Sequence, residues 1–307
     1  MDLKSKIILI SGPTSSGKSN FAIKLAKKIK GEIINADSMQ VYKQLQILTA
    51  RPKKEDLKKI KHHLYGFLPV NKYFSTGKWL KLVKKKVDQC IKNKKTPIIV
   101  GGTGLYFNAI TKGISQIPNI DNNTRTYVRE LQKRIGQKKF YEKLIYIDPL
   151  AKNKISPHDS QRTARAFEVK YGTKKSLYEW TTNTKSIFLN YDIKKIFINI
   201  PREELLKNIS VRTEKMFKNK CVDEVKNFLK LKIDKSLSPN KLIGIKEIGG
   251  YLSKLYNLDI AKNLINIKTR QYAKNQNTWS RGHMKNWNML YSKDLSILTK
   301  KTLKVIT

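Results

Sequence analysis

The sequence predicts an α/β fold built on a parallel sheet, with a helical insertion and a helical C-terminal region. Short apolar runs at 6–11, 31–36 and 97–100 alternate with amphipathic segments, as strands and crossover helices do. Glycine-rich turns follow the first and third runs. Near residue 118 the alternation gives way to short charged helical segments, and an apolar run returns at 194–200. We therefore expect a core formed by 1–117 and 191–307, interrupted by a helical insertion at 118–190.

The first strand, 6–11, leads through a glycine-rich loop into a helix predicted at 17–29. The loop matches the phosphate-binding pattern of Gly, four residues, Gly-Lys-Ser in its expected strand–turn–helix context. Its residues are Gly12, Pro13, Thr14, Ser15, Ser16, Gly17, Lys18 and Ser19. Backbone N–H groups and the helix dipole would face bound phosphates, Lys18 would add a positive charge, and the Ser19 hydroxyl could ligate a magnesium ion. The alternative is a chance match in an ordinary turn, which this context disfavours.

Polar residues follow the second strand, 31–36, at the edge where open α/β sheets place their chemistry. Asp37 comes first and is a candidate for the reacting centre, with Ser38 beside it. The alternative for Asp37 is the N-cap of a following helix. The third strand, 97–100, ends in the glycine-rich turn 101–104, which could bring backbone close to a ligand.

The predicted insertion contains helical segments at 121–135, 137–146 and 159–170, and these carry several arginines. Arg162 and Arg165 are three residues apart and share one helix face. This predicts a clamp for a nucleic-acid backbone, with a solvated basic face as the alternative. After 194–200, expected to complete the sheet, we expect helices from Pro201 and at 220–231, 241–254 and 258–288. In the last helix Trp279 could stack on a base, but we favour a core position for it.

The composition is strongly basic, with 64 Lys and Arg against 23 Asp and Glu and a net charge of +41. Such a charge indicates a polyanionic partner such as nucleic acid, although coding bias toward lysine would explain part of it. Cys90 and Cys221 predict reduced core thiols and no disulfide framework, which is typical of a cytoplasmic protein. We expect no signal peptide, no membrane span, and no metal site at the adjacent His62 and His63.

Five motifs in order together resemble the tRNA dimethylallyltransferase (isopentenyltransferase) family. They are Gly-Pro-Thr-Ser-Ser-Gly-Lys-Ser at 12–19, Asp-Ser-Met-Gln-Val-Tyr at 37–42, Gly-Gly-Thr-Gly-Leu-Tyr at 101–106, Gln-Arg-Thr-Ala-Arg-Ala-Phe-Glu-Val at 161–169 and Thr-Arg-Gln-Tyr-Ala-Lys-Asn-Gln-Asn-Thr-Trp at 269–279. The resemblance covers nearly the whole chain. It implies a P-loop nucleotide-kinase-like core, with the insertion holding the anticodon arm of tRNA.

The resemblance also implies a reaction. A dimethylallyl group would pass from dimethylallyl diphosphate to the exocyclic amine of the adenosine 3′-adjacent to the anticodon, in tRNAs reading codons that begin with U. Mg²⁺ would assist, and the enzyme would act as a monomer. Asp37 would be the general base, while Lys18, Ser19 and Arg212 would stabilise the diphosphate, with Ser19 as the metal ligand. Residues implied to contact tRNA are Asp37, Ser38, Met39, Gln40, Thr103, Arg125, Gln161, Arg162, Thr163, Ala164 and Arg165.

Three other function classes stay open. An isopentenyltransferase acting on free adenine nucleotides would share the loop and Asp37 but needs no basic insertion. A small-molecule kinase or NTPase would use ATP in the loop, and a non-enzymatic RNA-binding protein would not need Lys18, Ser19 and Asp37 together. The chain also departs from the family pattern at Asn208, Ile245 and Asn275, where we expect weaker contacts at the RNA rim or weaker helix packing.

Overall fold

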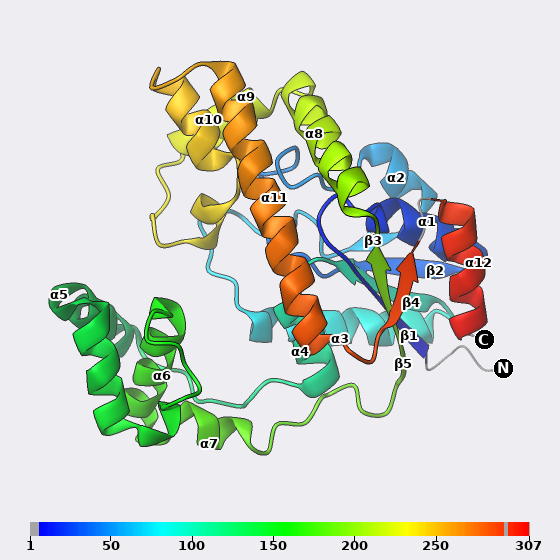
Figure 1. Cartoon of the computed structure of the whole chain (residues 1–307). Coiled ribbons are helices and arrows are strands. Elements are labelled where there is room, and N and C mark those ends of the chain that lie inside the picture. Colours follow the sequence, from blue (N-terminus) through cyan, green and yellow to red (C-terminus); the bar gives the residue numbers. More distant parts are fainter. Residues whose placement is uncertain (1–5, 292–293, 307) are drawn as a thin grey trace. The chain divides into compact units, whose positions relative to one another are not determined.

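The computed structural model describes residues 6–291 and 294–306 of the 307-residue chain. The ends of the predicted core segments, 1–5 and 307, and the pair 292–293 lie outside the described residues. The chain forms two compact units (Figure 1). Unit 1 comprises Met1–Ile110 and Asn190–Thr307, and unit 2 comprises Thr111–Leu189. Unit 2 thus begins before the boundary that we expected at residue 118.

Unit 1 is built on one parallel sheet with the strand order β3-β2-β4-β1-β5-β6. The strands are β1 (Lys6–Ser11), β2 (Gly31–Asn35), β3 (His62–His63), β4 (Thr96–Gly101), β5 (Asp192–Asn199) and β6 (Asn288–Tyr291). The four apolar residues of β1, Ile7 to Ile10, are almost fully buried, as expected for a strand at the centre of a parallel sheet. Because all strands run the same way, their carboxyl ends share one edge, which is where the glycine-rich turns lie.

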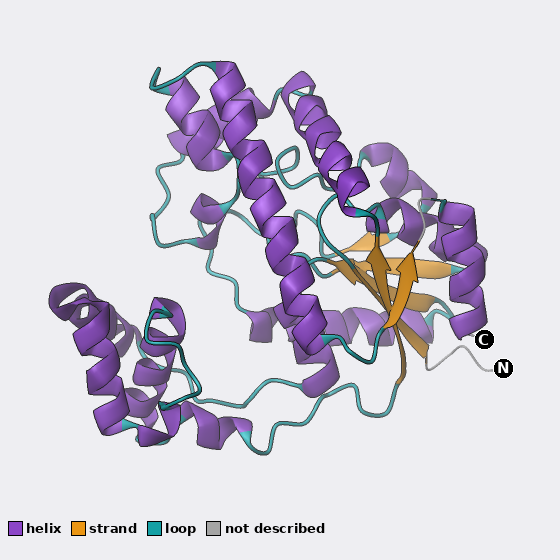
Figure 2. Cartoon of the chain, viewed as in Figure 1, coloured by secondary structure: helices purple, strands orange, loops and turns teal. Residues whose placement is uncertain are grey.

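Helices cover both faces of this sheet (Figure 2). The helices of unit 1 are α1 (Lys18–Lys28), α2 (Lys54–Lys59), α3 (Thr76–Lys92), α4 (Gly104–Lys112), α8 (Arg202–Lys218), α9 (Cys221–Lys230), α10 (Ile245–Leu252), α11 (Leu258–His283) and α12 (Leu295–Ile306). Ile8 and Ile10 of β1 pack with α1 and α12. Alternate residues point to the opposite face, where α3 packs against β2 and β4.

A second core in unit 1 joins the chain after β2 to the C-terminal helices. Val41, Tyr42 and Leu48 pack with residues of α8, α9, α10 and α11. The short 3-10 turn Ser238–Lys241 precedes α10. This core holds the segment after β2 against α8 and α11. Side chains from that segment and from both helices therefore line the same cavity.

Unit 2 is a small helical bundle with its own apolar core. It contains α5 (Asn122–Ile147), α6 (Ser160–Thr173), α7 (Leu177–Thr181) and a 3-10 turn at Pro149–Ala151. Phe140 of α5 stacks on Phe167 of α6 with ring centroids 4.9 Å apart. Gly136 interrupts α5 with φ 78° and ψ 161°, at the point where we predicted one helix to end and the next to begin.

Several sequence-based expectations were wrong. The run at 194–200 does not complete the sheet, since β6 adds a further strand beside β5. The helix predicted at 258–288 ends at His283, and α12 was not predicted. His62 and His63 form the short strand β3 and not a loop. The two strands that were missed, β3 and β6, have only two and four residues, and such short patterns do not stand out from a flanking helix or loop.

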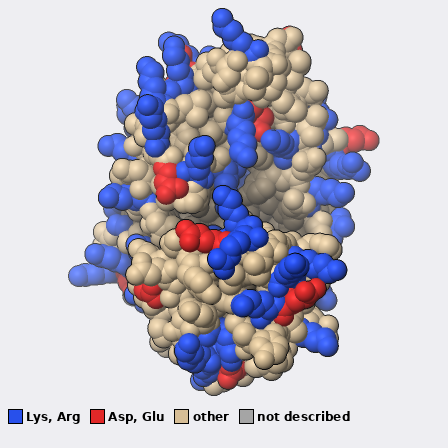
Figure 3. Space-filling model, turned by 90° about the vertical axis from the view of Figure 1, so that its left-hand side faces the viewer, with Lys and Arg blue, Asp and Glu red and all other residues tan. Residues whose placement is uncertain are grey.

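Lysine and arginine side chains crowd the face shown in Figure 3, as the net charge of +41 requires. Where the structure describes the chain, no helix combines the length and the apolar character needed to cross a membrane. Cys90 and Cys221 are buried and free, as predicted.

Candidate active site

The glycine-rich loop between β1 and α1 forms a phosphate cradle. Gly17 is the N-cap of α1 and has φ 83°, a left-handed conformation that glycine adopts without a steric penalty. Gly12 has no room for a side chain, because a Cβ there would lie 2.6 Å from the carbonyl oxygen of Ile198. The loop can therefore curl tightly into the N-terminus of α1, where the first backbone N–H groups of the helix can bind an anion.

Lys18 carries the positive charge of this cradle. Its Nζ donates to the Pro13 carbonyl at 2.9 Å and borders a cavity of about 450 Å³. Burial lowers the pKa of Lys18 to about 8, Asp37 opposes this shift, and Arg212 adds to it. An ammonium group that is poorly solvated and bonds to a neutral carbonyl gains much from a bound anion.

Two serine hydroxyls of the loop also indicate anion binding. The Oγ atoms of Ser15 and Ser16 are buried and find no hydrogen-bond partner among the described residues. Buried polar atoms without partners are costly and uncommon in folded proteins. Oxygens of a bound diphosphate would satisfy Ser15, which borders the cavity, so the loop fits an oxygen-rich anion.

Asp37 lies just beyond β2 and borders the same cavity. Its Oδ1 accepts hydrogen bonds from the backbone N–H groups of Met39 at 2.9 Å and Gln40 at 3.3 Å. The buried amide of Asn35 fixes the turn, because it accepts from the N–H of Asp37 and donates to its carbonyl. The N-cap alternative was wrong, since turns and not a helix follow Asp37.

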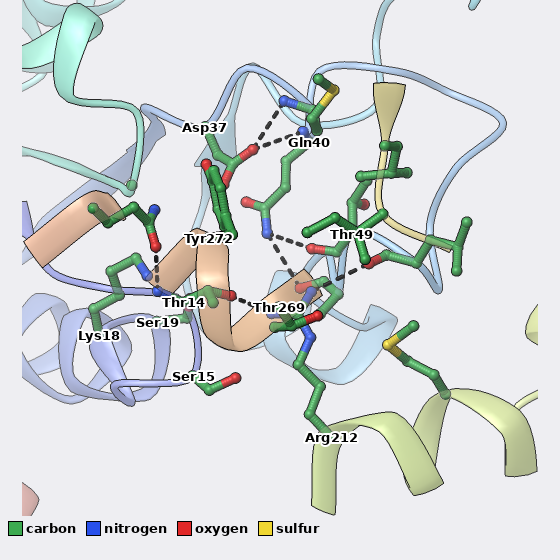
Figure 4. A pocket seen from close by; sticks show the side chains of 18 of the residues that line it. Thr14, Ser15, Lys18, Ser19, Asp37, Gln40, Thr49, Arg212, Thr269 and Tyr272 are labelled. Carbon is green, nitrogen blue, oxygen red and sulfur yellow. Dashed lines mark hydrogen bonds between the residues drawn. The ribbon is translucent and has the colours of Figure 1, made fainter. Parts of the chain in front are cut away.

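Arg212 reaches the loop from α8. Its guanidinium donates to Thr14 Oγ1 at 2.8 Å and to the Leu48 carbonyl at 3.2 Å. Burial lowers the pKa of Arg212, and the charge of Asp37 opposes that shift. Figure 4 shows Lys18, Asp37 and Arg212 approaching the cavity from different elements of the fold. Two cations and one carboxylate therefore share one partly enclosed space.

Gln276 of α11 is a site residue that sequence reasoning missed. Its Oε1 accepts from the N–H of Thr14 at 2.8 Å, and its Nε2 donates to the Gly102 carbonyl at 2.9 Å. One side chain thus joins the two glycine-rich turns. Tyr272 and Thr269 of the same helix also border the cavity. All three lie in or beside the motif at 269–279, so its spacing of polar residues was the available signal.

The far wall of the cavity is apolar. This wall contains the side chains of Met39, Leu48, Met216, Leu242, Ile243 and Ile265. A cavity lined by cations and hydroxyls as well as by apolar side chains suits a molecule with a charged head and a hydrocarbon tail.

A second cavity, of about 240 Å³, adjoins the turn at Gly102. Ser38, Tyr272 and Gln276 border both cavities, while Thr103 and Trp279 border only the second. Thr103 Oγ1 accepts from the N–H of Ser38 at 3.0 Å. The two cavities therefore meet along a shared set of side chains next to Asp37.

Trp279 and two of the departures from the family pattern have defined positions. The Trp279 ring stacks on His283 at 4.3 Å and stays half-buried, so our prediction of a core position was wrong. The side-chain amide of Asn208 donates to the Ser15 carbonyl at 3.4 Å. Ile245 is buried in the second core of unit 1. The change at Asn208 thus belongs to the phosphate cradle.

Unit 2 carries the other residues implied to contact tRNA. Gln161 and Arg162 are exposed at the start of α6, where Arg162 pairs with Asp159 at 3.3 Å. Arg125 is half-buried. Thr163 and Ala164 are buried, so their side chains pack α6 into its bundle.

Arg165 and Arg129 share one buried carboxylate in unit 2. Arg129 lies 3.1 Å and Arg165 3.5 Å from the two oxygens of Glu168, which is 2% exposed. Both arginine side chains stay partly exposed. The pairing holds them on one face of the α5–α6 pair.

A buried cluster beside β2 and β3 contains Glu32, His63 and Cys90. Their atoms that could bind a metal ion lie within 4.8 Å of one another. His63 Nε2 lies 2.6 Å from Glu32 Oε2, and the Cys90 thiol donates to the same oxygen at 3.5 Å. Burial raises the pKa of Cys90 to about 12, so the thiol keeps its proton. The three groups satisfy one another, and the cluster serves to hold β3 and α3 to β2.

A family model described as IPP transferase matches residues 40–283. The chain belongs to the IPP transferase family. A tRNA dimethylallyltransferase of Pelagibacter ubique is 56% identical over 287 residues, covering 94% of this chain and 92% of that protein. One from Rickettsia massiliae is 43% identical over 277 residues, covering 90% of this chain and 76% of that protein.

Solved structures of the family share the fold. A tRNA isopentenylpyrophosphate transferase from Bacillus halodurans superposes with a TM-score of 0.70 at 27% identity, covering 98% of this chain and 97% of that one. A eukaryotic dimethylallyltransferase acting on tRNA gives a TM-score of 0.81 at 26% identity, covering 95% and 75%. The P-loop-like α/β core is thereby confirmed, and the chain is an enzyme that transfers prenyl groups. The tRNA-directed activity is supported over the free-nucleotide and kinase alternatives.

Proposed function

We propose that this chain transfers a dimethylallyl group from dimethylallyl diphosphate to the exocyclic amine of the adenosine 3′-adjacent to the anticodon, in tRNAs reading codons that begin with U. The observation that carries the proposal is the placement of Asp37 in the same cavity as Lys18 and Arg212. The bond between carbon 1 of the prenyl group and the diphosphate oxygen breaks, and a bond from that carbon to the amine nitrogen forms. The amine proton passes to Asp37, and diphosphate leaves.

The phosphate cradle would stabilise the leaving group. Backbone N–H groups at the start of α1 and the cations Lys18 and Arg212 face the charge that grows on the diphosphate as the carbon–oxygen bond breaks. The loop residues Gly12, Pro13, Thr14, Ser15, Ser16 and Gly17 form the rest of this site. The apolar wall beyond them would accept the five-carbon chain.

The adenosine would enter through the second cavity. Ser38 and Thr103 border that cavity, and Met39 and Gln40 follow Asp37 on the other side. The exocyclic amine is a weak nucleophile because its lone pair is delocalised into the ring. A base held in place by Asn35 and the turn therefore supplies orientation as well as proton removal. The target base must leave its stack, which costs less in an anticodon loop than in a duplex.

Mg²⁺ fits this donor set. The Ser19 hydroxyl borders the cavity beside the phosphate cradle and offers an oxygen ligand of the kind that this ion prefers. When bound, the ion would neutralise charge on the diphosphate. We assign Ser19 as its protein ligand.

Unit 2 would hold the anticodon arm. The exposed Gln161 and Arg162, with Arg125 and Arg165, offer donors to RNA phosphates, while the buried Thr163 and Ala164 support their helix. We propose that the enzyme acts as a monomer in the cytoplasm, where its tRNA substrate is made.

The test uses purified protein, Mg²⁺ and labelled dimethylallyl diphosphate. Unmodified tRNA with adenosine 3′ of the anticodon is offered beside AMP and ATP. Label should enter only the tRNA and should be lost when that adenosine is replaced by guanosine. Label in AMP or ATP would show a free-nucleotide enzyme, and release of phosphate from ATP without label transfer would show a kinase or NTPase.

A further inference from the structure

A loop formed by residues 45–50 builds one wall of the donor cavity. Leu48, Thr49 and Ala50 border the cavity directly. The Leu48 carbonyl accepts from Arg212, at 3.2 Å. The Thr49 and Ala50 carbonyls accept from the side-chain amide of Gln40, at 2.8 Å and 3.3 Å. The 45–50 loop thus orients two polar side chains that face the site from different elements.

Glu224 holds this loop from behind. The residue lies in the first turn of α9, and its carboxylate accepts hydrogen bonds from three consecutive backbone N–H groups. The N–H of Gln46 lies 2.8 Å from Oε2, that of Ile47 2.8 Å from Oε2, and that of Leu48 2.9 Å from Oε1. Such a row of N–H groups is an anion-binding concavity, here filled by a carboxylate of the same chain. Glu224 itself does not border the cavity.

We propose that Glu224 is a positioning residue for the donor diphosphate, acting on Arg212 through the 45–50 loop. The connection is continuous: the carboxylate fixes the N–H of Leu48, the Leu48 carbonyl fixes the Arg212 guanidinium, and that guanidinium contacts Thr14 of the phosphate cradle. The inference rests on the proposed contact of Arg212 with the diphosphate. Residues 48 and 224 are 176 positions apart, so no local sequence pattern links them.

The chemistry of the loop requires an anion with two accepting oxygens. Glutamine has the same shape but carries an NH₂ group in place of the second oxygen. That NH₂ group is a donor and would face a backbone N–H donor, so the hydrogen bond there would be lost. Glu224→Gln should therefore release part of the loop while leaving α9 folded. Glu224→Asp keeps the charge on a shorter stem and should retain part of the effect.

Asp223 is the matched control. It is exposed, it lies in the same first turn of α9, and Asp223→Asn removes the same charge from the same helix N-terminus. Any effect of the helix dipole or of net charge appears in both variants, whereas an effect through the 45–50 loop appears only at Glu224.

The experiment measures the dissociation constant of dimethylallyl diphosphate with Mg²⁺ and without tRNA, and then kcat and KM with tRNA. Glu224→Gln should weaken donor binding by roughly 10- to 100-fold, the range expected when a charged group is misplaced by about 1 Å. Glu224→Asp should fall between wild type and Glu224→Gln, and Asp223→Asn should stay within about twofold of wild type.

The decisive measurement repeats Glu224→Gln in an Arg212→Ala background. If Glu224 acts through Arg212, its effect on donor binding should largely vanish there, because residues of one connected network do not add. Full additivity, or wild-type donor binding in Glu224→Gln, overturns the inference while leaving the donor site intact. Unchanged donor binding in Arg212→Ala alone overturns the proposed donor site and the inference with it.

Discussion

The cations of unit 1 and unit 2 are held in opposite ways. In unit 1, Lys18 and Arg212 have lost solvation, and each has defined hydrogen-bond partners on the loop or its neighbours. In unit 2, the side chains of Arg162 and Arg129 are 73% and 66% exposed. Each of these exposed arginines has a single carboxylate partner.

This difference separates two kinds of recognition. Poorly solvated charges in fixed positions stabilise charge at a particular point, and small displacements cost them much. Exposed charges on helices contribute by releasing counterions from a polyanion, so each contributes modestly and depends on salt. We therefore expect changes in unit 1 to alter turnover and donor binding, and changes in unit 2 to alter tRNA affinity.

The largest effect is expected at Asp37. Asp37→Asn keeps an oxygen that can accept from Met39 and Gln40 but removes the base, so single-turnover transfer should fall by about 10²- to 10⁴-fold. Asp37→Ala should abolish transfer. In both variants tRNA affinity, measured by filter binding, should stay close to wild type. Turnover at the wild-type rate would remove Asp37 from the mechanism and break the contrast between the units.

Lys18 should make donor binding depend on pH. Its pKa is lowered to about 8, so the free enzyme loses this charge as pH rises from 7 to 9. Diphosphate favours the charged form, and binding above pH 8 must therefore take up a proton. Donor affinity should be constant below about pH 7. Above pH 8 it should decrease with a slope that approaches tenfold per pH unit, as linkage of one proton requires. Calorimetry in two buffers of different ionisation enthalpy measures that uptake, and a flat profile up to pH 10 would contradict it.

Local patterns explain how much of the site could be predicted. The phosphate loop and Asp37 are written in short stretches, because a strand, a turn and a helix N-terminus each have a recognisable sequence. Gln276 and Glu224 contact residues 262 and 176 positions away, so the sequence around them does not show which residues they bond. Strand β6 has four residues, of which only Leu290 is buried, so it carries no alternating pattern.

Asn208 shows the same limit for a departure from the family pattern. From sequence it was expected at the RNA rim or in helix packing, yet it contacts the Ser15 carbonyl in the phosphate cradle. Its position is set by how α8 packs against α11 and α9, which depends on the whole fold. Local chemistry predicts which residue types a loop needs, and tertiary packing decides which distant side chains complete it.

The smallest effect is expected in unit 2. Arg162→Ala should weaken tRNA binding only a few-fold at moderate salt, and it should reduce the slope of log affinity against log salt by about 1 if that side chain contacts a phosphate. Donor binding and single-turnover transfer at saturating tRNA should not change.

The matched control for Arg162 is Arg202→Ala, which removes one exposed arginine from the N-terminal end of α8 in unit 1. One outcome is that the two variants weaken tRNA binding equally and reduce the slope of log affinity against log salt equally. In that case the general charge of +41 attracts tRNA, and the helices of unit 2 have no special part. If only Arg162→Ala changes the slope, the exposed arginines of unit 2 form the contact, and the contrast with the fixed cations of unit 1 holds at single-residue level.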